Sequence, residues 1–192
     1  MGLSPVPSLV IRYPLYCLLI GAQTKIGSIR KGPSFDATNI TAMAALSGAK
    51  HMPVRILIAD DDACIRRLLS RVLGEHEGWE VCGEAGNGQE AIQQAEKLTP
   101  DIAIIDLAMP CMNGLEAARE ISKMSPAAAM LLLTVQEVST QLIKEARQAG
   151  FQGAVSKGTG AEVIKGVETL LCKQTYFKSG PAVLGVPHSA AS

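Results

Sequence analysis

The chain has 192 residues, with 18 basic and 18 acidic side chains, no formal net charge, and 47% apolar residues. This length suffices for one domain with appendages and excludes three. The charge balance argues against a cationic surface that grips nucleic acid or anionic lipid. The five cysteines form no C-x-x-C pair and lie far from the three histidines, which argues against a zinc site or a disulfide scaffold and favours a reducing cytoplasm.

The first quarter of the chain differs in character from the rest. Residues 1–53 carry five basic groups and one acid, contain several prolines and show no regular period, whereas residues 54–177 carry 12 basic groups and 17 acids. We therefore expect residues 1–53 to be a flexible N-terminal extension, and Met52, directly before the first strong strand, is a candidate for the native start. The apolar stretch from Tyr13 to Ala22 is too short to span a bilayer.

From Val54 onwards, short apolar runs alternate with segments of helical period. The runs predict strands over Arg55–Ala59, Glu80–Ala85, Ile102–Asp106, Met130–Thr134 and Gly153–Ser156. The periodic segments predict a first helix around Ile65–Leu73 and further helices over Gly88–Leu98, Gly114–Lys123, Val138–Ala149 and Ala161–Leu171. Five successive βα units predict a doubly wound α/β domain over residues 54–175, with a parallel five-stranded sheet covered on both faces. Residues 176–192 are expected to be a short tail.

Polar side chains follow these strands at their carboxyl ends. Asp60, Asp61 and Asp62 follow the first strand, Asp106 ends the third, Thr134 ends the fourth and Lys157 follows the fifth. Because parallel strands bring their carboxyl ends to one edge, where open α/β sheets bind ligands, we expect these groups to converge. Clustered carboxylates repel unless a cation is present, and a hard oxygen-seeking ion such as Mg²⁺ suits them.

The same residues suit phosphoryl chemistry. A carboxylate can act as the nucleophile that forms an aspartyl phosphate, and a metal ion, Lys157 and the Thr134 hydroxyl would then meet the phosphoryl oxygens. Strand-end acids also serve as helix caps. For Asp62, directly before the first helix, capping is the favoured interpretation. Capping explains neither the lysine nor the threonine, so the remaining groups are better explained by a site.

With this set of strand-end residues, the sequence resembles the receiver domains of two-component response regulators. The resemblance covers about residues 54–175 and implies the flavodoxin-like (βα)5 receiver fold with strand order 2-1-3-4-5. It is carried by these stretches: Ile56–Asp61, Asp106–Pro110 with Gly114, Leu133-Thr134 and Ala154–Lys157.

The resemblance implies a role for each matching acid. Asp106 matches the phosphoacceptor, and Asp60 and Asp61 match the acidic pair that holds Mg²⁺ together with Asp106. The backbone carbonyl of Ala108 is expected to complete the protein's metal ligands.

The remaining matches concern the phosphoryl group and the loop beside it. Thr134 matches the switch hydroxyl and Lys157 the lysine that contacts the phosphoryl group. Met109, Pro110 and Gly114 are expected to shape the loop that leaves the third strand.

The implied function is a phosphorylation-controlled switch rather than an enzyme acting on other molecules. A histidine kinase or phosphotransfer protein is the expected donor to Asp106. The face formed by Val138–Ala149, Gly153–Ser156 and Ala161–Leu171 is expected to bind a partner or a second copy. We expect a cytoplasmic location and no membrane association. We also expect no direct binding of nucleic acid, because too few residues follow Phe177 for a DNA-binding output domain.

Three positions depart from the common receiver pattern. Gly158 follows Lys157 where many receivers have proline, which is similar to the LuxR/NarL-type subgroup with helix-turn-helix output domains. Val135 follows Thr134 where a smaller residue is common, and is expected to narrow access to an acyl phosphate. Ala154 stands where many receivers have an aromatic switch residue.

Two other functions fit parts of the pattern. Asp60-x-Asp62, Thr134 and Lys157 imitate three motifs of a haloacid-dehalogenase-like phosphatase, but only Glu162 and Glu168, both in the predicted last helix, follow the lysine to supply the fourth. The segment from Gly86 to Ala91, with Asp106 about 20 residues on, matches a dinucleotide-binding fingerprint. That fingerprint leaves Asp60, Asp61 and Lys157 without a role, and a glycine-rich turn explains it equally.

Overall fold

The computed structural model describes residues 52–178. The extension predicted over residues 1–53 therefore lies almost entirely outside the described residues, as does the tail beyond Lys178. The strands are β1 (Val54–Ala59), β2 (Trp79–Ala85), β3 (Ile102–Asp106), β4 (Ala129–Thr134), β5 (Gly153–Ser156) and β6 (Tyr176–Phe177). The helices are α3 (Ala63–Gly74), α4 (Gly88–Leu98), α5 (Gly114–Met124), α6 (Thr140–Ala149) and α7 (Gly160–Leu171).

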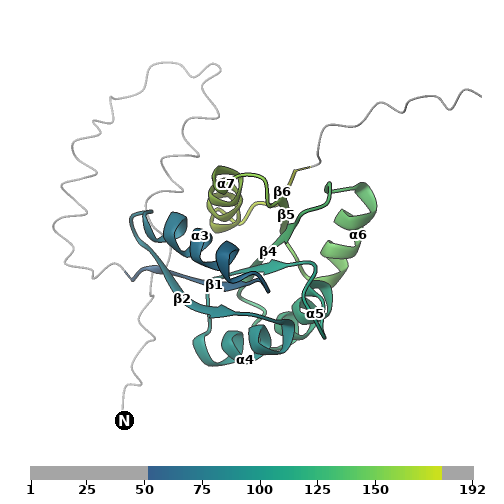
Figure 1. Ribbon diagram of the computed structural model, residues 1–192, viewed down its shortest axis with the longest axis horizontal. Helices are drawn as coiled ribbons and strands as arrows, with labels where there is room; N and C mark the ends of the chain where they lie inside the picture. The colour runs from purple at the N-terminus through teal and green to yellow at the C-terminus, as the bar shows by residue number, and fades with distance from the viewer. Residues whose placement is uncertain (1–51, 179–192) are drawn as a thin grey trace, which may run out of the picture. The chain divides into compact units, whose positions relative to one another are not determined.

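The strands form one sheet with helices on both faces (Figure 1), as predicted. The sheet order is β2-β1-β3-β4-β5-β6, and the pairings from β1 through β3, β4 and β5 to β6 are parallel. The predicted order 2-1-3-4-5 is therefore confirmed, with a sixth strand added beside β5. Helices α3 and α7 cover one face of the sheet, and α4, α5 and α6 cover the other.

The central strands are the most apolar segments of the domain. Every residue of β3 is buried, and in β4 all residues from Met130 to Thr134 are buried. Such runs without alternation fit strands that are covered on both sides. The core they form is continuous with the small residues of α4, α5 and α6, including Ala91, Ala118 and Ala146, which let these helices approach the sheet closely.

Polar caps set where the helices begin. The side chains of Asp62, Asn87, Asn113 and Ser139 each accept a hydrogen bond from a main-chain N–H in the first turn of α3, α4, α5 and α6. These bonds satisfy donors that a helix end leaves without partners. The cap at Ser139 explains why α6 begins two residues after the predicted start at Val138. Over residues 52–178, none of the helices combines the length and apolarity that crossing a bilayer requires.

The sixth strand corrects the prediction that residues from 176 onwards are a tail. Tyr176 and Phe177 pair with Gly153 and Ala154 of β5, so the chain returns from α7 to extend the sheet. Phe177 thus lies opposite Ala154, the position where the sequence lacks the expected ring. The Arg147 guanidinium of α6 lies 4.6 Å from the centre of the Phe177 ring, a cation–π contact.

Candidate functional site

Three carboxylates meet at the carboxyl edge of the sheet. Asp60 and Asp61 follow β1 and Asp106 ends β3, and because these strands are neighbours in the sheet the three side chains converge. One oxygen from each carboxylate can be chosen so that all three lie within 4.8 Å of one another. Asp60 and Asp106 are buried, whereas Asp61 is exposed. The predicted convergence of these acids is therefore present in the structure.

Lys157 joins the cluster from β5, two strands away from Asp106. Its ammonium nitrogen lies 2.7 Å from Asp60 Oδ2 and 3.0 Å from Asp106 Oδ1. The lysine side chain is 14% exposed. The main chain fixes the lysine too, because its N–H donates to the carbonyl of Thr134 at 2.8 Å. One largely buried cation therefore bridges two buried carboxylates.

The close packing of charged groups in the cluster shifts the pKa values of Asp106 and Lys157. Burial raises the pKa of Asp106, the hydrogen bond and charge of Lys157 oppose that rise, and the charges of Asp60 and Asp61 add to it. For Lys157, burial acts to lower the pKa, but the hydrogen bonds to Asp60 and Asp106 and their charges outweigh it and raise the pKa. The acids outnumber the single cation, so the site retains negative charge in an environment that penalises it.

The donor set fits a hard cation. Asp60 Oδ2 is buried, and the Lys157 ammonium nitrogen at 2.7 Å compensates its charge. Carboxylate oxygens from three residues, one of them open to solvent, match the way Mg²⁺ is held by a few protein oxygens while it keeps several waters. The predicted ligand Ala108 lies exposed in the loop that follows β3.

Asp62 does not join this cluster as a ligand. Its carboxylate accepts a hydrogen bond from the Cys64 N–H at 2.7 Å and caps α3, as predicted. That hydrogen bond is the main cause that lowers the pKa of Asp62. The Asp62 N–H in turn donates to Asp60 Oδ1 at 3.0 Å, which orients the Asp60 carboxylate.

Thr134 is buried at the end of β4. Its hydroxyl oxygen accepts a hydrogen bond from the Gln136 N–H at 3.0 Å. The register pairs Asp106 with Leu133, so Thr134 lies one residue beyond the acid on the adjacent strand. The side chain of Val135, which follows it, is 78% exposed.

The loop after β3 returns directly onto Asp106. The Gly114 N–H donates to the Leu107 carbonyl at 3.0 Å, and Met109 is buried in the core while Pro110 is exposed. A Cβ atom at Gly114 would overlap the Asp106 carbonyl oxygen and come within 3.2 Å of the Leu107 Cα atom. These are main-chain atoms that cannot swing aside, so the position requires glycine.

Gly114→Ala is therefore expected to lower the free energy of unfolding by about 2–3 kcal/mol, the range for overpacking a rigid environment. The matched control is Gly74→Ala, since a Cβ atom there meets no atom within 4 Å. Urea unfolding of both variants, followed by the fluorescence of Trp79, measures the difference. Equal stabilities of the two variants would contradict the close approach at Gly114.

Two residues beneath the acidic loop were not anticipated from the sequence. Arg66 of α3 donates through Nη1 to the main-chain carbonyls of Asp60 at 2.7 Å and Asp61 at 3.3 Å. Its Nε lies 3.4 Å from Glu84 Oε2 on β2. The sequence does not indicate these contacts, because Arg66 binds main-chain carbonyls, which every residue has.

The two alternative functions do not fit these positions. The acids beyond Lys157, Glu162 and Glu168, lie within α7 and supply no further acidic loop. A Cβ atom at Gly88 would lie 2.7 Å from the Met112 carbonyl oxygen, so this glycine allows the loop after β3 to pack against α4. The glycine-rich segment is thus the turn before α4, capped by Asn87.

Known proteins resemble this chain in sequence and in fold. The family model described as "Response regulator receiver domain" matches residues 56–167. The chain is 33% identical over 128 residues to the response regulator GacA of Pseudomonas viridiflava, covering 65% of this chain and 58% of GacA. It is 39% identical over 106 residues to the chemotaxis protein CheY of Thermotoga maritima, covering 55% of this chain and 87% of CheY.

Solved structures of response regulators have a similar fold. A LuxR-family two-component response regulator from Aurantimonas superposes with a TM-score of 0.62 at 30% identity, covering 65% of this chain and 89% of that one. Other relatives are longer, and the match spans only 27% of a protein-glutamate methylesterase from Alkalilimnicola ehrlichii. The range 56–167 matched by the family model includes the three clustered acids and Lys157. By sequence and by fold, this chain belongs to the response regulator receiver domain family.

Proposed function

We propose that Asp106 accepts a phosphoryl group and that the resulting acyl phosphate switches the surface by which the domain binds a partner. The observation that carries the proposal is the position of Lys157, which contacts Asp106 Oδ1 and Asp60 Oδ2 together. A lysine in this place compensates the charge of the acids before phosphorylation and is within reach of a phosphoryl group on Asp106 afterwards.

Asp60, Asp61 and Asp106 are the residues that would hold Mg²⁺, with the Ala108 carbonyl as a further ligand. Bound there, Mg²⁺ supplies positive charge to the phosphoryl oxygens. The protein's own contribution is to orient the carboxylates. Asp60 is fixed by the Asp62 N–H and by Lys157.

In the transfer step, a carboxylate oxygen of Asp106 forms a bond to phosphorus while the phosphorus–nitrogen bond of a phosphohistidine breaks. The electron pair of that bond stays on the imidazole nitrogen of the donor. Lys157 offers its ammonium protons to the phosphoryl oxygens, and the Thr134 hydroxyl, released from the Gln136 N–H, donates to another. Transfer from acetyl phosphate differs only in that a phosphorus–oxygen bond breaks and acetate leaves.

The test is the intact mass of the protein after incubation with acetyl phosphate. We expect one added phosphoryl group in the presence of Mg²⁺ and none when the metal is removed by chelation. Peptide mass spectrometry should locate the modification on Asp106. An unchanged mass over a range of small phosphodonors, with the metal present, would refute the proposed phosphoacceptor.

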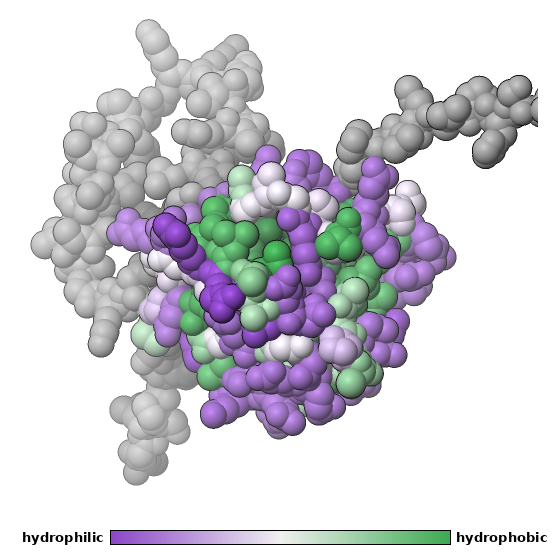
Figure 2. Space-filling model, in the orientation of Figure 1, coloured by the Kyte–Doolittle hydropathy of each residue, from purple (hydrophilic) through white to green (hydrophobic). Residues whose placement is uncertain are grey.

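An apolar groove beside the site is a suitable surface for the phosphodonor. Ile65, Leu68 and Val72 of α3 line it together with Val163 of α7, and Lys157 borders it. Leu68 is 55% exposed, and Figure 2 shows apolar surface gathered between α3 and α7. A helix of a histidine kinase or phosphotransfer protein that covers this groove would bring its phosphohistidine to the edge of the sheet where Asp106 lies.

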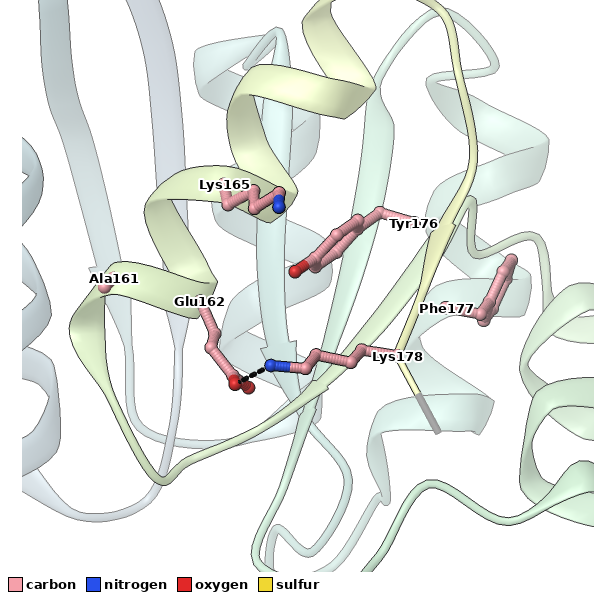
Figure 3. Close-up of a pocket in the computed structure, with 6 residues that line it drawn as sticks. All are labelled: Ala161, Glu162, Lys165, Tyr176, Phe177 and Lys178. Atoms are coloured by element: carbon pink, nitrogen blue, oxygen red, sulfur yellow. Dashed lines mark hydrogen bonds and ion pairs between the residues drawn. The ribbon is translucent and has the colours of Figure 1, made fainter. Parts of the chain in front are cut away.

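Strand β6 covers part of the face formed by α6, β5 and α7, which we expect to bind a partner. A face made of α6, β5 and α7 would include the edge of β5, but that edge is paired with Tyr176 and Phe177. Figure 3 shows how this segment is held: Lys178 reaches Glu162 of α7 in an ion pair, and Tyr176 lies along α7. A Cβ atom at Gly166 would lie 3.3 Å from the Tyr176 ring, so α7 is shaped to accept it. The exposed part of this face therefore includes β6.

A chain that ends at Thr175 is expected to self-associate more strongly than a chain that ends at Lys178. Without β6, the carbonyls of Gln152 and Ala154, which accept from the Tyr176 and Lys178 N–H groups, lose their donors, and the edge at β5 becomes open and pairs readily with another chain. Light scattering coupled to size-exclusion chromatography measures the difference. Identical molar masses at all concentrations would show that β6 does not protect this edge.

We further propose a cytoplasmic location and a role confined to receiving a phosphoryl group, without catalysis on other molecules or direct contact with nucleic acid. The excess of acids over residues 54–177 supports the last point, because it disfavours the phosphate backbone. The match spans 58% of GacA. The proposal therefore concerns the receiver domain and not the activity of any output domain in a longer protein.

A further inference from the structure

We propose that Arg66 is a positioning residue for the metal site, and that it acts through the main chain of the acidic loop rather than by contact with the metal. The inference rests on the proposed function, in that Asp60 and Asp61 are taken as Mg²⁺ ligands. Arg66 itself donates to the carbonyl oxygens of these two residues, at 2.7 and 3.3 Å.

The loop between β1 and α3 has few other restraints on Asp61. Within residues 52–178, the Asp61 carboxylate is exposed and takes part in no hydrogen bond or ion pair. Neither the Asp60 nor the Asp61 carbonyl accepts a main-chain hydrogen bond in this part of the chain. Arg66 supplies the donor for both. Because a carbonyl shares its peptide plane with the next residue, holding two successive carbonyls sets the direction in which the Asp61 side chain leaves the loop.

Arg66 is itself held in place from β2. Its Nε lies 3.4 Å from Glu84 Oε2, and the other Glu84 oxygen accepts a hydrogen bond from the Ser70 hydroxyl at 2.6 Å. Ser70 lies one turn after Arg66 on α3. The Asp60 N–H donates to the Ala85 carbonyl at 3.0 Å, so side chains and main chain together fasten the acidic loop to the end of β2.

The guanidinium group suits this task. It is planar, carries donors in a fixed fork, and is therefore able to serve two carbonyls and a carboxylate at once, whereas a lysine ammonium ion lacks that geometry. Pairing with Glu84 also reduces its positive charge near a site that must attract a cation. Residues that orient metal ligands from behind typically change metal affinity by 10–100-fold when they are replaced.

The charge of Arg66 and its positioning role have opposite consequences, which makes the test decisive. Removing a positive charge near a cation site should by itself tighten Mg²⁺ binding. Losing the hold on the Asp60 and Asp61 carbonyls should weaken it. We expect Arg66→Met to weaken Mg²⁺ binding about tenfold despite the lost charge, and Arg66→Lys to weaken it by less.

Mg²⁺ affinity is measured directly by isothermal titration calorimetry on the whole chain, and urea unfolding of each variant confirms that it is folded. Arg67→Met is the matched control, because it removes the same charge from the next residue of α3, whose Nη2 donates to Cys64 Sγ at 3.3 Å and not to the carbonyls of the acidic loop. It should bind Mg²⁺ as well as the unchanged protein or slightly better. Glu84→Gln should also weaken Mg²⁺ binding, because it both loosens Arg66 and leaves the guanidinium charge unpaired near the cation site.

The outcomes separate this inference from the proposed function. If the unchanged chain binds no Mg²⁺, both are wrong. If it binds Mg²⁺ and Arg66→Met binds equally or more tightly, Arg66 does not position the site, although the metal site itself stands. An equal loss in Arg66→Met and Arg67→Met would show that the loss does not depend on the contacts of Arg66 with the Asp60 and Asp61 carbonyls, and would also overturn the positioning role.

Discussion

Asp106→Asn is expected to abolish phosphoryl uptake from acetyl phosphate and, in the same protein, to raise the stability of the metal-free domain at neutral pH. The first effect follows because an amide oxygen cannot form the acyl phosphate. The second follows because burial raises the pKa of Asp106, so its ionised form is penalised in the folded state. Intact mass measures the first effect and urea unfolding without metal the second.

The pH dependence of the second effect has a definite sign. The folded-state pKa of Asp106 lies above its ordinary value of 3.8, so over the interval between them the folded protein binds more protons than the unfolded chain. The Asp106 contribution to stability therefore becomes less favourable as pH rises through that interval and stays so above it. Asp106→Asn should lose this component, and its advantage over the unchanged protein should vanish below the ordinary pKa.

If Asp106→Asn is more stable and no longer accepts a phosphoryl group, the ionised Asp106 carboxylate lowers the stability of the fold and is retained because phosphorylation requires it. Asp101→Asn is the control for a carboxylate outside the cluster, whose Oδ2 accepts a hydrogen bond from the Arg55 N–H at 3.0 Å. It should leave phosphoryl uptake unchanged. Uptake of a phosphoryl group by Asp106→Asn would place the acceptor elsewhere and contradict the proposed role.

The fold and the convergence of the acids could be predicted because both depend on patterns that the sequence carries over several residues. The run Ile102–Asp106 and the segment Gly88–Leu98 have the same bounds in the structure as in the prediction. Once the strands are known to be parallel, their carboxyl ends must share an edge, and Asp60, Asp106 and Lys157 are brought together by topology alone.

The parts that could not be predicted depend on single contacts. A two-residue strand such as β6 is shorter than any periodic signal, and its partner Ala154 gives no hint that Phe177 will lie opposite it. The Arg66 contacts involve main-chain oxygens, which every residue has. The exposed Asp61 and the buried Asp60 are adjacent and identical in the sequence, and only the three-dimensional structure distinguishes them.

Lys157→Met is expected to lower the free energy of unfolding of the metal-free protein by about 3 kcal/mol, the lower end of the range for removing one partner of a buried ion pair. The substitution leaves Asp60 and Asp106 buried together without their common cation. Lys165→Met on the exposed face of α7 is the control and should change stability by less than about 0.5 kcal/mol. Urea unfolding followed by Trp79 fluorescence measures both.

Two further measurements connect this loss to the acid cluster. Mg²⁺ should restore part of the stability of Lys157→Met, because a bound cation takes over the charge compensation, and adding Asp106→Asn should restore part of it as well, because one of the two stranded acids is gone. The pKa of Lys157 is raised above its ordinary value of 10.5, so its stabilising contribution is complete below that pH and is lost only as the pH rises through the folded-state pKa. The difference between the unchanged protein and Lys157→Met should therefore persist through neutral pH. If Lys157→Met is as stable as Lys165→Met, the lysine does not offset the repulsion between the acids, and its place between Asp60 and Asp106 no longer supports a phosphoryl site.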